Sequence, residues 1–186
     1  MKKDHQRMIP PSRDPLDVQR TGTHFQIIIV PVNTAFLERA IELAVENARA
    51  GGGPFGAVIV RDGKILAEGV NMVISTNDPT AHAEVTAIRN ASRVLGAFHM
   101  PGCEIYSSCE PCPMCLGAIY WAHLDRVYFG ATQREASQSE FDDSHIYEQI
   151  ALPPESRLIP MIHVASGARA LAPFRVWMER ENRIRY

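Results

Sequence analysis

The sequence Ser108-Cys109-Glu110-Pro111-Cys112-Pro113-Met114-Cys115 places two cysteines three residues apart at the start of an expected helix. Pro113 fits the first turn of a helix, because its missing N–H is not needed there. The helix is therefore expected to begin near Cys112 and to continue through Trp121. Thiolates spaced i and i+3 share one face, and the positive end of the helix lowers their pKa. Cys112 and Cys115 are predicted ligands of one zinc ion.

The sequence Thr80-Ala81-His82-Ala83-Glu84, upstream of the cysteines, supplies a nitrogen ligand and a carboxylate. The turn-forming segment Asp78-Pro79-Thr80 is expected to open a helix over residues 81–95, with His82 and Glu84 in its first turn. Residues i and i+2 are about 200° apart on a regular helix, so both reach one ion only if its N-terminus points at the site. His82 completes three protein ligands, which leaves the fourth tetrahedral position for water, as in catalytic zinc sites.

Glu84 is the acidic group left over for chemistry. Two thiolates already balance the charge of Zn²⁺, so the bound water is less acidic than at a three-histidine site, and a carboxylate that takes its proton becomes valuable. This suits hydrolytic deamination, in which water attacks the carbon bearing an exocyclic amine and Glu84 moves a proton to the ring nitrogen and on to the departing ammonia. The His-x-Glu and Pro-Cys-x-x-Cys combination is the established signature of zinc deaminases that act on nucleobases.

From Thr34 to Tyr186 the sequence resembles the cytidine deaminase-like superfamily and, within it, the bacterial guanine deaminases. The matching segments are Gly52-Gly53-Pro54-Phe55-Gly56-Ala57-Val58-Ile59-Val60, Asn77-Asp78-Pro79-Thr80-Ala81-His82-Ala83-Glu84-Val85, residues 108–121, Phe141-Asp142-Asp143-Ser144 and the terminal Tyr186. The resemblance implies one zinc ion per subunit and conversion of guanine to xanthine and ammonia in purine catabolism. Ammeline is a further candidate substrate.

The resemblance also implies which residues contact the substrate. Asn71 would hydrogen-bond the purine ring, although an asparagine at a strand end also forms turns. The backbone of Ala83 would help the carboxylate shuttle to orient the ring, and Trp121 or His99 would help to line the pocket. The C-terminal segment would be exchanged across a homodimer, so that Tyr186 closes the pocket of the neighbouring subunit.

Two further groups are assigned from their chemistry. Asp143 is predicted to be a second catalytic carboxylate, because an amino group at purine C2 lies away from the position that Glu84 alone can serve. Asp142 and Asp143 can equally be the cap and first-turn charge of the helix that follows, and Asp142 is favoured for that structural role. Phe55 is expected to form part of a stacking wall, and a core position after Pro54 is the alternative.

Other functions fit parts of the same pattern. A closed structural site that includes Cys109, or a redox-active Cys109-x-x-Cys112 pair, leaves Glu84 without a role. Guanosine deaminases share nearly all of the motifs, but the resemblance implies that Tyr186 is a lid, which would favour the free base because it leaves little room for ribose. A tRNA adenosine deaminase and a zinc module without enzyme activity are the remaining alternatives.

Composition limits the partners and the compartment. The chain has 186 residues, of which 46% are hydrophobic and 22% charged, as is ordinary for one globular domain. A net charge of -2 gives no general attraction for phosphate backbones, so no nucleic-acid partner is expected. No apolar run approaches the roughly 18 residues of a membrane span, and clustered cysteines suit a reducing compartment, so we expect a cytoplasmic protein without a membrane partner.

The chain is expected to comprise a mobile N-terminal extension over residues 1–31 and a zinc-dependent deaminase domain over residues 32–186, whose C-terminal tail contributes to a dimer. The extension is polar and shows no apolar period. Alternation of strands and helices after a hairpin predicts an α/β fold, a three-layer α/β/α sandwich around a mixed central sheet. The expected elements are helices at residues 34–50, 81–95, 112–121, 144–150 and 173–182, and strands at residues 55–60, 64–70, 104–107, 126–131 and 161–165. Residues 24–30 are expected to form a short strand or to dock on a partner.

Overall fold

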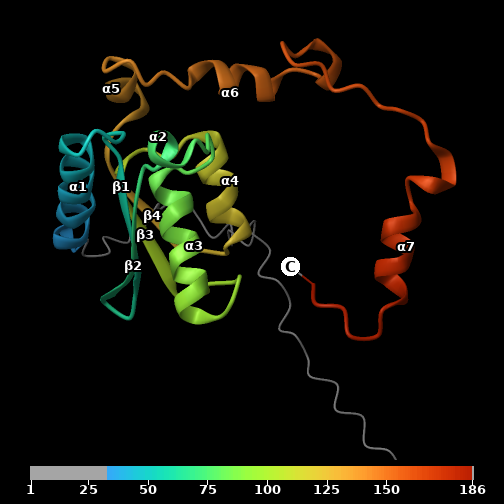
Figure 1. Cartoon of the computed structure of the whole chain (residues 1–186), viewed down its shortest axis with the longest axis horizontal. Helices are drawn as coiled ribbons and strands as arrows, with labels where there is room; N and C mark the ends of the chain where they lie inside the picture. Colours follow the sequence, from blue (N-terminus) through green and yellow to red (C-terminus); the bar gives the residue numbers. More distant parts are fainter. Residues whose placement is uncertain (1–32, 186) are drawn as a thin grey trace, which may run out of the picture. The chain divides into compact units, whose positions relative to one another are not determined.

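The computed structural model describes residues 33–185 (Figure 1). The expected extension over residues 1–31, the short strand or docking segment expected within it and the terminal Tyr186 lie outside the described residues. The helices and strands are, in chain order, α1 (Thr34–Arg49), β1 (Gly56–Arg61), β2 (Lys64–Val70), α2 (Val73–Thr76), α3 (Ala83–Leu95), β3 (Cys103–Cys109), α4 (Pro113–Trp121), β4 (Arg126–Ala131), α5 (Gln133–Ser137), α6 (Ser144–Ala151) and α7 (Ala172–Glu179).

Within the described residues, one sheet holds four strands in the order β2-β1-β3-β4. β1 pairs antiparallel with both β2 and β3, whereas β3 and β4 run parallel. Parallel neighbours need a crossover connection, and α4 provides it. α1 covers one face of the sheet, and α3 and α4 cover the other (Figure 1). The predicted three-layer α/β/α sandwich with a mixed central sheet is confirmed.

α1 packs on its face of the sheet through a small apolar cluster. Asn33 caps the helix, and its side chain accepts a hydrogen bond from Ala35 N at 3.2 Å. Gly56 lets the helix approach β1 closely, because a Cβ there would collide with the backbone of Ala40. The buried residues of the cluster are Leu43, Val58, Val60 and Tyr106.

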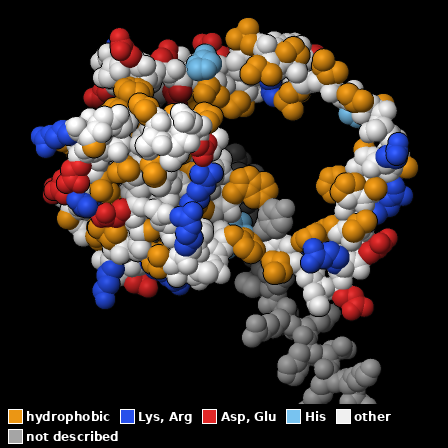
Figure 2. All heavy atoms as spheres, in the orientation of Figure 1, with side chains coloured by type: hydrophobic (Ala, Val, Ile, Leu, Met, Phe, Trp, Pro, Cys, Tyr) orange, Lys and Arg blue, Asp and Glu red, His pale blue; other side chains and the backbone are white. Residues whose placement is uncertain are grey.

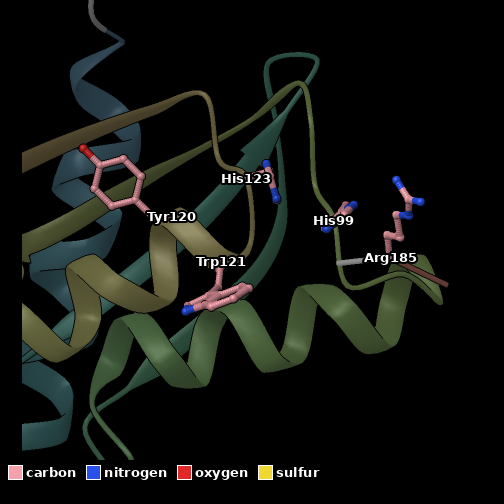
Figure 3. Close-up of a pocket in the computed structure, with 5 residues that line it drawn as sticks. All are labelled: His99, Tyr120, Trp121, His123 and Arg185. Carbon is pink, nitrogen blue, oxygen red and sulfur yellow. The ribbon is translucent and has the colours of Figure 1, made fainter. Parts of the chain in front are cut away.

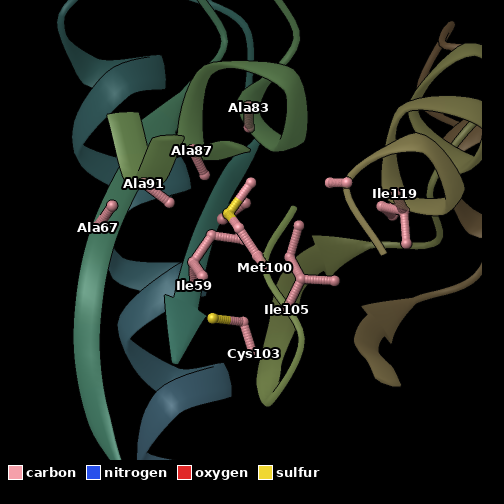
Figure 4. Close-up of a cluster of buried hydrophobic side chains, with 11 residues drawn as sticks. Ile59, Ala67, Ala83, Ala87, Ala91, Met100, Cys103, Ile105 and Ile119 are labelled. Carbon is pink, nitrogen blue, oxygen red and sulfur yellow. The ribbon is translucent and has the colours of Figure 1, made fainter. Parts of the chain in front are cut away.

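Small side chains bring α3 close to the opposite face. Ala83, Ala87 and Ala91 recur at intervals of four residues and are fully buried. A Cβ at Gly69 would collide with the backbone of Ala87, so this glycine allows α3 to lie directly on β2. Further side chains complete this larger core, among them Ile59, Met100, Ile105 and Ile119 (Figure 4).

The strand directions place several polar segments at one end of the strands. β1 begins at this end of the sheet, where Gly56 pairs with Val70, the last residue of β2. The parallel strands β3 and β4 both end there, where Cys109 pairs with Ala131. Ligands of open α/β sheets bind outside the carboxyl ends of the strands, next to the N-termini of the following helices. The fold therefore places the segments after β2, β3 and β4 around one site.

Most expected elements are confirmed to within a residue or two, with differences at the site and in the tail. α3 begins at Ala83 and not at Ala81, because His82 keeps an extended backbone (φ −67°, ψ 160°) as the N-cap. The expected strand at residues 161–165 is wrong, since that segment has no regular structure. A strand needs a hydrogen-bonded neighbour, and the sheet provides none for it. The short helices α2 and α5 were not expected from the sequence, because so few residues show no apolar period.

Beyond β4 the described chain forms short helices that bury little. No residue of α6 or α7 is buried. Leu158, Ile159 and Ile162 are 81%, 84% and 81% exposed. Figure 2 shows hydrophobic side chains along the surface of this segment. None of the described helices combines the length and the apolar character that crossing a lipid bilayer requires.

Candidate active site

His82 is the N-cap of α3. Its side chain makes no capping hydrogen bond, and its ring faces the N-terminus of α4. The helix still begins in register, because His82 O accepts a hydrogen bond from Thr86 N at 2.9 Å. Since the extended backbone of His82 breaks the helical spacing, its side chain and that of Glu84 can both reach the same place.

Cys112 holds the equivalent position in α4. It is the N-cap, with extended ψ of 167°, and Pro113 follows in the first turn, as the sequence predicts. Cys115 lies in the same first turn and is fully buried. The first backbone N–H groups of a helix have no partner within the helix and favour negative charge beside them. Two helix N-termini therefore present a ring nitrogen and two sulfurs to one point.

The geometry of this cluster fits a zinc ion. His82 Nδ1 lies 3.6 Å from Cys112 Sγ and 3.5 Å from Cys115 Sγ. A tetrahedral zinc with bond lengths of about 2.0 Å to nitrogen and about 2.3 Å to sulfur separates such atoms by about 3.5 Å. Within the described residues, no other histidine, cysteine or carboxylate belongs to the cluster. The donor set is therefore of the three-ligand type that catalytic zinc sites use.

The pKa values of the Cys112 and Cys115 thiols are shifted in opposite directions. A hydrogen bond from the Cys115 thiol lowers the pKa of Cys112 to about 4. The same hydrogen bond, together with burial, raises the pKa of Cys115. Cys115 Sγ also lies 3.3 Å from Glu84 Oε2, which can accept its proton. The thiolate form is therefore favoured at Cys112, and Cys115 has a proton acceptor beside it, which suits thiolate binding to Zn²⁺.

Glu84 is 6% exposed, in the first turn of α3 beside the cluster. Ser107 Oγ, from β3, donates a hydrogen bond to Glu84 Oε1 at 3.1 Å, which leaves Oε2 on the side of Cys115. Burial raises the pKa of Glu84 above its ordinary value. A carboxylate with a raised pKa exchanges protons near neutral pH more effectively than an ordinary one. The sequence did not single out Ser107, because the pairing of β3 with the helix layer is a tertiary contact.

Cys109 stands apart from the three-ligand cluster. It is buried at the end of β3, and its Sγ lies 3.9 Å from Thr132 O. Burial raises the pKa of Cys109 to about 11, so the thiol form is favoured. Redox chemistry requires the thiolate. Cys109 is also not among the three residues whose ligand atoms lie together, so the geometry favours a three-residue site over a closed four-residue site.

A cavity of about 460 Å³ opens beside the cluster. This volume lies within the range of about 300–1,000 Å³ typical of small-molecule sites. The predicted site residues in its lining are His82, Glu84, Cys112, Asn71, Phe55 and Asp143. No lysine or arginine is among the described residues that line it.

An aromatic pair and an asparagine form part of the cavity wall. The rings of Phe55 and Phe141 meet edge to face, with centroids 4.9 Å apart and planes at 88°. Phe141 was not predicted as a wall residue, although it belongs to the matched Phe-Asp-Asp segment. Asn71 is 9% exposed, directly after β2, and Val73 N donates to its Oδ1 at 3.2 Å.

Asp142 and Asp143 both line the cavity but have different partners. Asp142 Oδ1 accepts a hydrogen bond from Ser144 N at 2.9 Å at the start of α6. Asp143 makes no such capping bond, and its Oδ1 accepts from Gln133 Nε2 at 2.7 Å. The backbone N of Gln133 in turn donates to Glu110 Oε2 at 2.9 Å. Neither Gln133 nor Glu110 was predicted, because polar residues in short loops carry no periodic signal.

Trp121 lies in a different hollow from the predicted metal ligands. It is 66% exposed at the end of α4. Figure 3 shows this second hollow, which is lined by His99, Tyr120, Trp121, His123 and Arg185.

Ala83 is fully buried and lies in the sequence between the two cavity residues His82 and Glu84. Tyr186 lies outside the described residues.

Comparison with known proteins agrees with this geometry. The family model for the cytidine and deoxycytidylate deaminase zinc-binding region matches residues 31–131, more than half of the chain. A guanine deaminase of Bacillus subtilis (strain 168) is 55% identical over 152 residues, which cover 81% of this chain and 97% of that protein. The chain belongs to the guanine deaminase family of zinc deaminases.

Solved structures of guanine deaminases extend the comparison. The X-ray structure of the Bacillus subtilis guanine deaminase superposes with a TM-score of 0.81 at 53% identity, covering 83% of this chain and 99% of that chain. A structure of guanine deaminase from Nitrosomonas europaea gives a TM-score of 0.58 at 30% identity, covering 61% and 66%. A tRNA-specific adenosine deaminase of Agrobacterium fabrum is 44% identical over 95 residues, covering 49% of this chain and 62% of that protein.

Proposed function

We propose that this chain is a hydrolytic deaminase that converts guanine and water to xanthine and ammonia, with one zinc ion per subunit. The observation that carries the proposal is the position of Glu84, a buried carboxylate beside a three-ligand cluster at a cavity sized for a small molecule. Identity of 55% to a guanine deaminase along nearly its whole length supports guanine as the substrate. Ammeline is a second candidate.

The chemistry follows from the groups around Glu84. A zinc ion held by the three ligands would supply a water of lowered pKa. Glu84 would accept one proton from the attacking water and give it to the ring nitrogen next to C2, while the water oxygen adds to C2. The second water proton passes to the amine, which leaves as ammonia, and the C2 oxygen becomes the new carbonyl. Ser107 holds one carboxylate oxygen, so the other faces the reacting atoms.

Asp143 is proposed as a second carboxylate that assists departure of the amine. It lines the cavity, and its side-chain Oδ1 accepts a hydrogen bond from Gln133 Nε2 at 2.7 Å. Asp142 is tied to the start of α6 and is proposed as structural.

Asp143→Asn is expected to lower kcat for guanine by about 100-fold, because an amide cannot deliver a proton in this way. Asp142→Asn is the matched control in the same loop and is expected to change kcat by less than about threefold. Ammonia release under saturating guanine measures both. Equal losses of kcat in the two variants would contradict the separate roles.

Substrate recognition is proposed to use the aromatic wall and the buried asparagine. Phe55, with Phe141 beside it, offers an apolar surface on which a purine can stack. Asn71 offers donor and acceptor atoms to the ring edge, and the backbone of Ala83 orients the ring beside Glu84. A contact from Trp121 would have to come from a second copy of the chain, since in one chain it lines the other hollow.

The charge of the cavity argues against phosphorylated substrates. Its carboxylates are Glu84, Glu110, Glu140, Asp142 and Asp143, and no cationic side chain among the described residues balances them in the lining. Placing a phosphate against like charges costs several kcal/mol. The site is therefore better suited to a free base than to a nucleotide or to tRNA.

A substrate panel tests the proposed function. Guanine is expected to release ammonia, and GMP to have a kcat/KM at least about 100-fold lower because of the like charges in the cavity. Guanosine, cytidine, ammeline and a tRNA with a wobble adenosine complete the panel. Faster turnover of guanosine than of guanine would identify a guanosine deaminase, inosine in the tRNA would identify a tRNA deaminase, and no ammonia from any compound would indicate a zinc module without enzyme activity.

The exposed tail supports a homodimer with exchanged C-terminal segments. The described residues after α6 present a series of apolar side chains to solvent, among them Leu158, Ile159 and Ile162. Tyr120 and Trp121 on α4 are also exposed, at 75% and 66%. Large exposed apolar surfaces mark interaction sites in soluble proteins. We propose that the tail packs on a second copy, so that Tyr186 reaches the cavity of the partner, and that the enzyme acts in cytoplasmic purine catabolism.

Complementation tests the exchange. Glu84→Gln and Tyr186→Ala subunits are each expected to have low activity alone, whereas co-refolded mixtures should recover about a quarter of the wild-type activity per subunit. The hybrid dimer contains one site with both Glu84 and the partner's tyrosine. Activity equal to the sum of the two variants measured separately would show that no exchange occurs. Light scattering gives the oligomeric state of each sample.

A further inference from the structure

Asn47 is a partly buried residue in the last turn of α1, outside the cavity lining. Its Nδ2 donates to Gly53 O and to Asn71 O, each at 2.8 Å. A side-chain amide nitrogen carries two hydrogens, so both are used. Gly53 and Asn71 both line the cavity, although they belong to different loops. One amide therefore ties α1 to two separate walls of the site.

Asn71 is held at three of its polar atoms. Its backbone N donates to Phe55 O at 3.1 Å, and its backbone O accepts from Asn47. Its Oδ1 accepts from Val73 N at 3.2 Å, which fixes the orientation of the side-chain amide. Among the described residues, no hydrogen bond uses Asn71 Nδ2. This donor stays available for a ring acceptor of a bound purine.

Two glycines make room for the two amides. Gly52 N donates to Asn47 O at 2.8 Å, and a Cβ on Gly52 would lie 2.5 Å from Asn47 Nδ2. A Cβ on Gly53 would lie 2.8 Å from Asn71 Cγ. Heavy atoms pack favourably at about 3.5–4.0 Å, so a side chain at either glycine would displace an amide. The loop and the two asparagines therefore form one close-packed unit.

We propose that Asn47 is the positioning residue for substrate recognition, which places the amide of Asn71 and the wall at Phe55 without touching the substrate. The inference rests on the proposed function, because it assumes that guanine binds in this cavity. The metal ligands and Glu84 are at the N-termini of α3 and α4, and none of them bonds to Asn47. Asn47 thus acts on binding of the ring and not on proton transfer.

Asn47→Leu keeps a similar volume and removes both donors. We expect it to raise KM for guanine about tenfold while kcat changes by less than about threefold and zinc content is unchanged. Asn47→Asp is a second variant of the same size. It places a carboxylate oxygen next to the carbonyl oxygens of Gly53 and Asn71, to which it cannot donate a hydrogen bond. It is expected to raise KM at least as much. A merely structural role would lower the melting temperature and the yield of active enzyme with KM unchanged.

Asn90→Leu is the matched control. Asn90 also ties a helix to the sheet, because its Nδ2 donates to Glu68 O at 2.9 Å, but neither residue lines the cavity. This variant is expected to lower the melting temperature and to leave KM for guanine unchanged. A raised KM in Asn90→Leu would mean that loosening any helix contact weakens substrate binding, which would overturn the specific role of Asn47.

A double-mutant cycle tests whether Asn47 acts through Asn71. If it does, Asn47→Leu raises KM much less in an Asn71→Ala background than in the wild type. Additive effects, or an unchanged KM in both Asn47 variants beside a raised KM in Asn71→Ala, would overturn the inference alone. Failure of the wild-type protein to release ammonia from guanine would instead contradict the proposed function.

Discussion

Replacement of Glu84 by glutamine is expected to lower kcat for guanine by about 1,000-fold, the size of effect attributed to a positioned proton-transfer group. Glutamine has the same shape and can still accept the hydrogen bond that Ser107 Oγ donates at 3.1 Å. The lost property is the ability to take up and release a proton beside the metal cluster. Zinc content should be unchanged, since Glu84 is not one of the three candidate metal ligands.

Ammonia release and metal analysis on the same preparation measure both quantities. Ser107→Ala serves as the graded control, because it leaves the carboxylate in place and removes only the group that holds it. Its kcat is expected to fall about tenfold, between the wild type and Glu84→Gln. Full deaminase activity in a zinc-loaded Glu84→Gln or Glu84→Ala enzyme would show that another group moves the proton.

Cys112→Ser is expected to abolish zinc binding and, with it, guanine turnover. Cys112 is the N-cap of α4, and serine is among the best N-cap residues, so the helix should keep its start. A serine hydroxyl is a much poorer zinc ligand than a thiolate because it stays protonated near neutral pH. The expected loss of kcat is about 1,000-fold or more, with zinc far below one ion per subunit.

Cys109→Ser is the matched control for the metal site. Cys109 lies in the same cysteine segment, but the geometry leaves it outside the cluster and near Thr132 O. The variant is expected to keep its zinc and most of its activity after dialysis against a weak chelator. Loss of zinc from Cys109→Ser with retention in Cys112→Ser would require a different ligand set.

Local rules in the sequence pointed to His82, Cys112 and Cys115, and the structure places these three side chains together. The Cys112-x-x-Cys115 spacing with an intervening proline is short-range information, and α4 begins where it predicts. Predictions that depended on contacts with another part of the chain were less accurate. The segment at residues 161–165 has strand-like composition but no strand to pair with, and α3 starts two residues later than its turn signal indicates.

The sequence by itself determined the candidate donor atoms for a metal, the acidic residue near them and the alternation of helices and strands, because these depend on spacing along one segment. Only the tertiary structure decided that Ser107 holds Glu84, that Gln133 meets Asp143 and that Asn47 reaches two loops of the cavity. These contacts join residues on separate elements. Their partners are chosen by strand order and helix packing, to which no local pattern of residues corresponds.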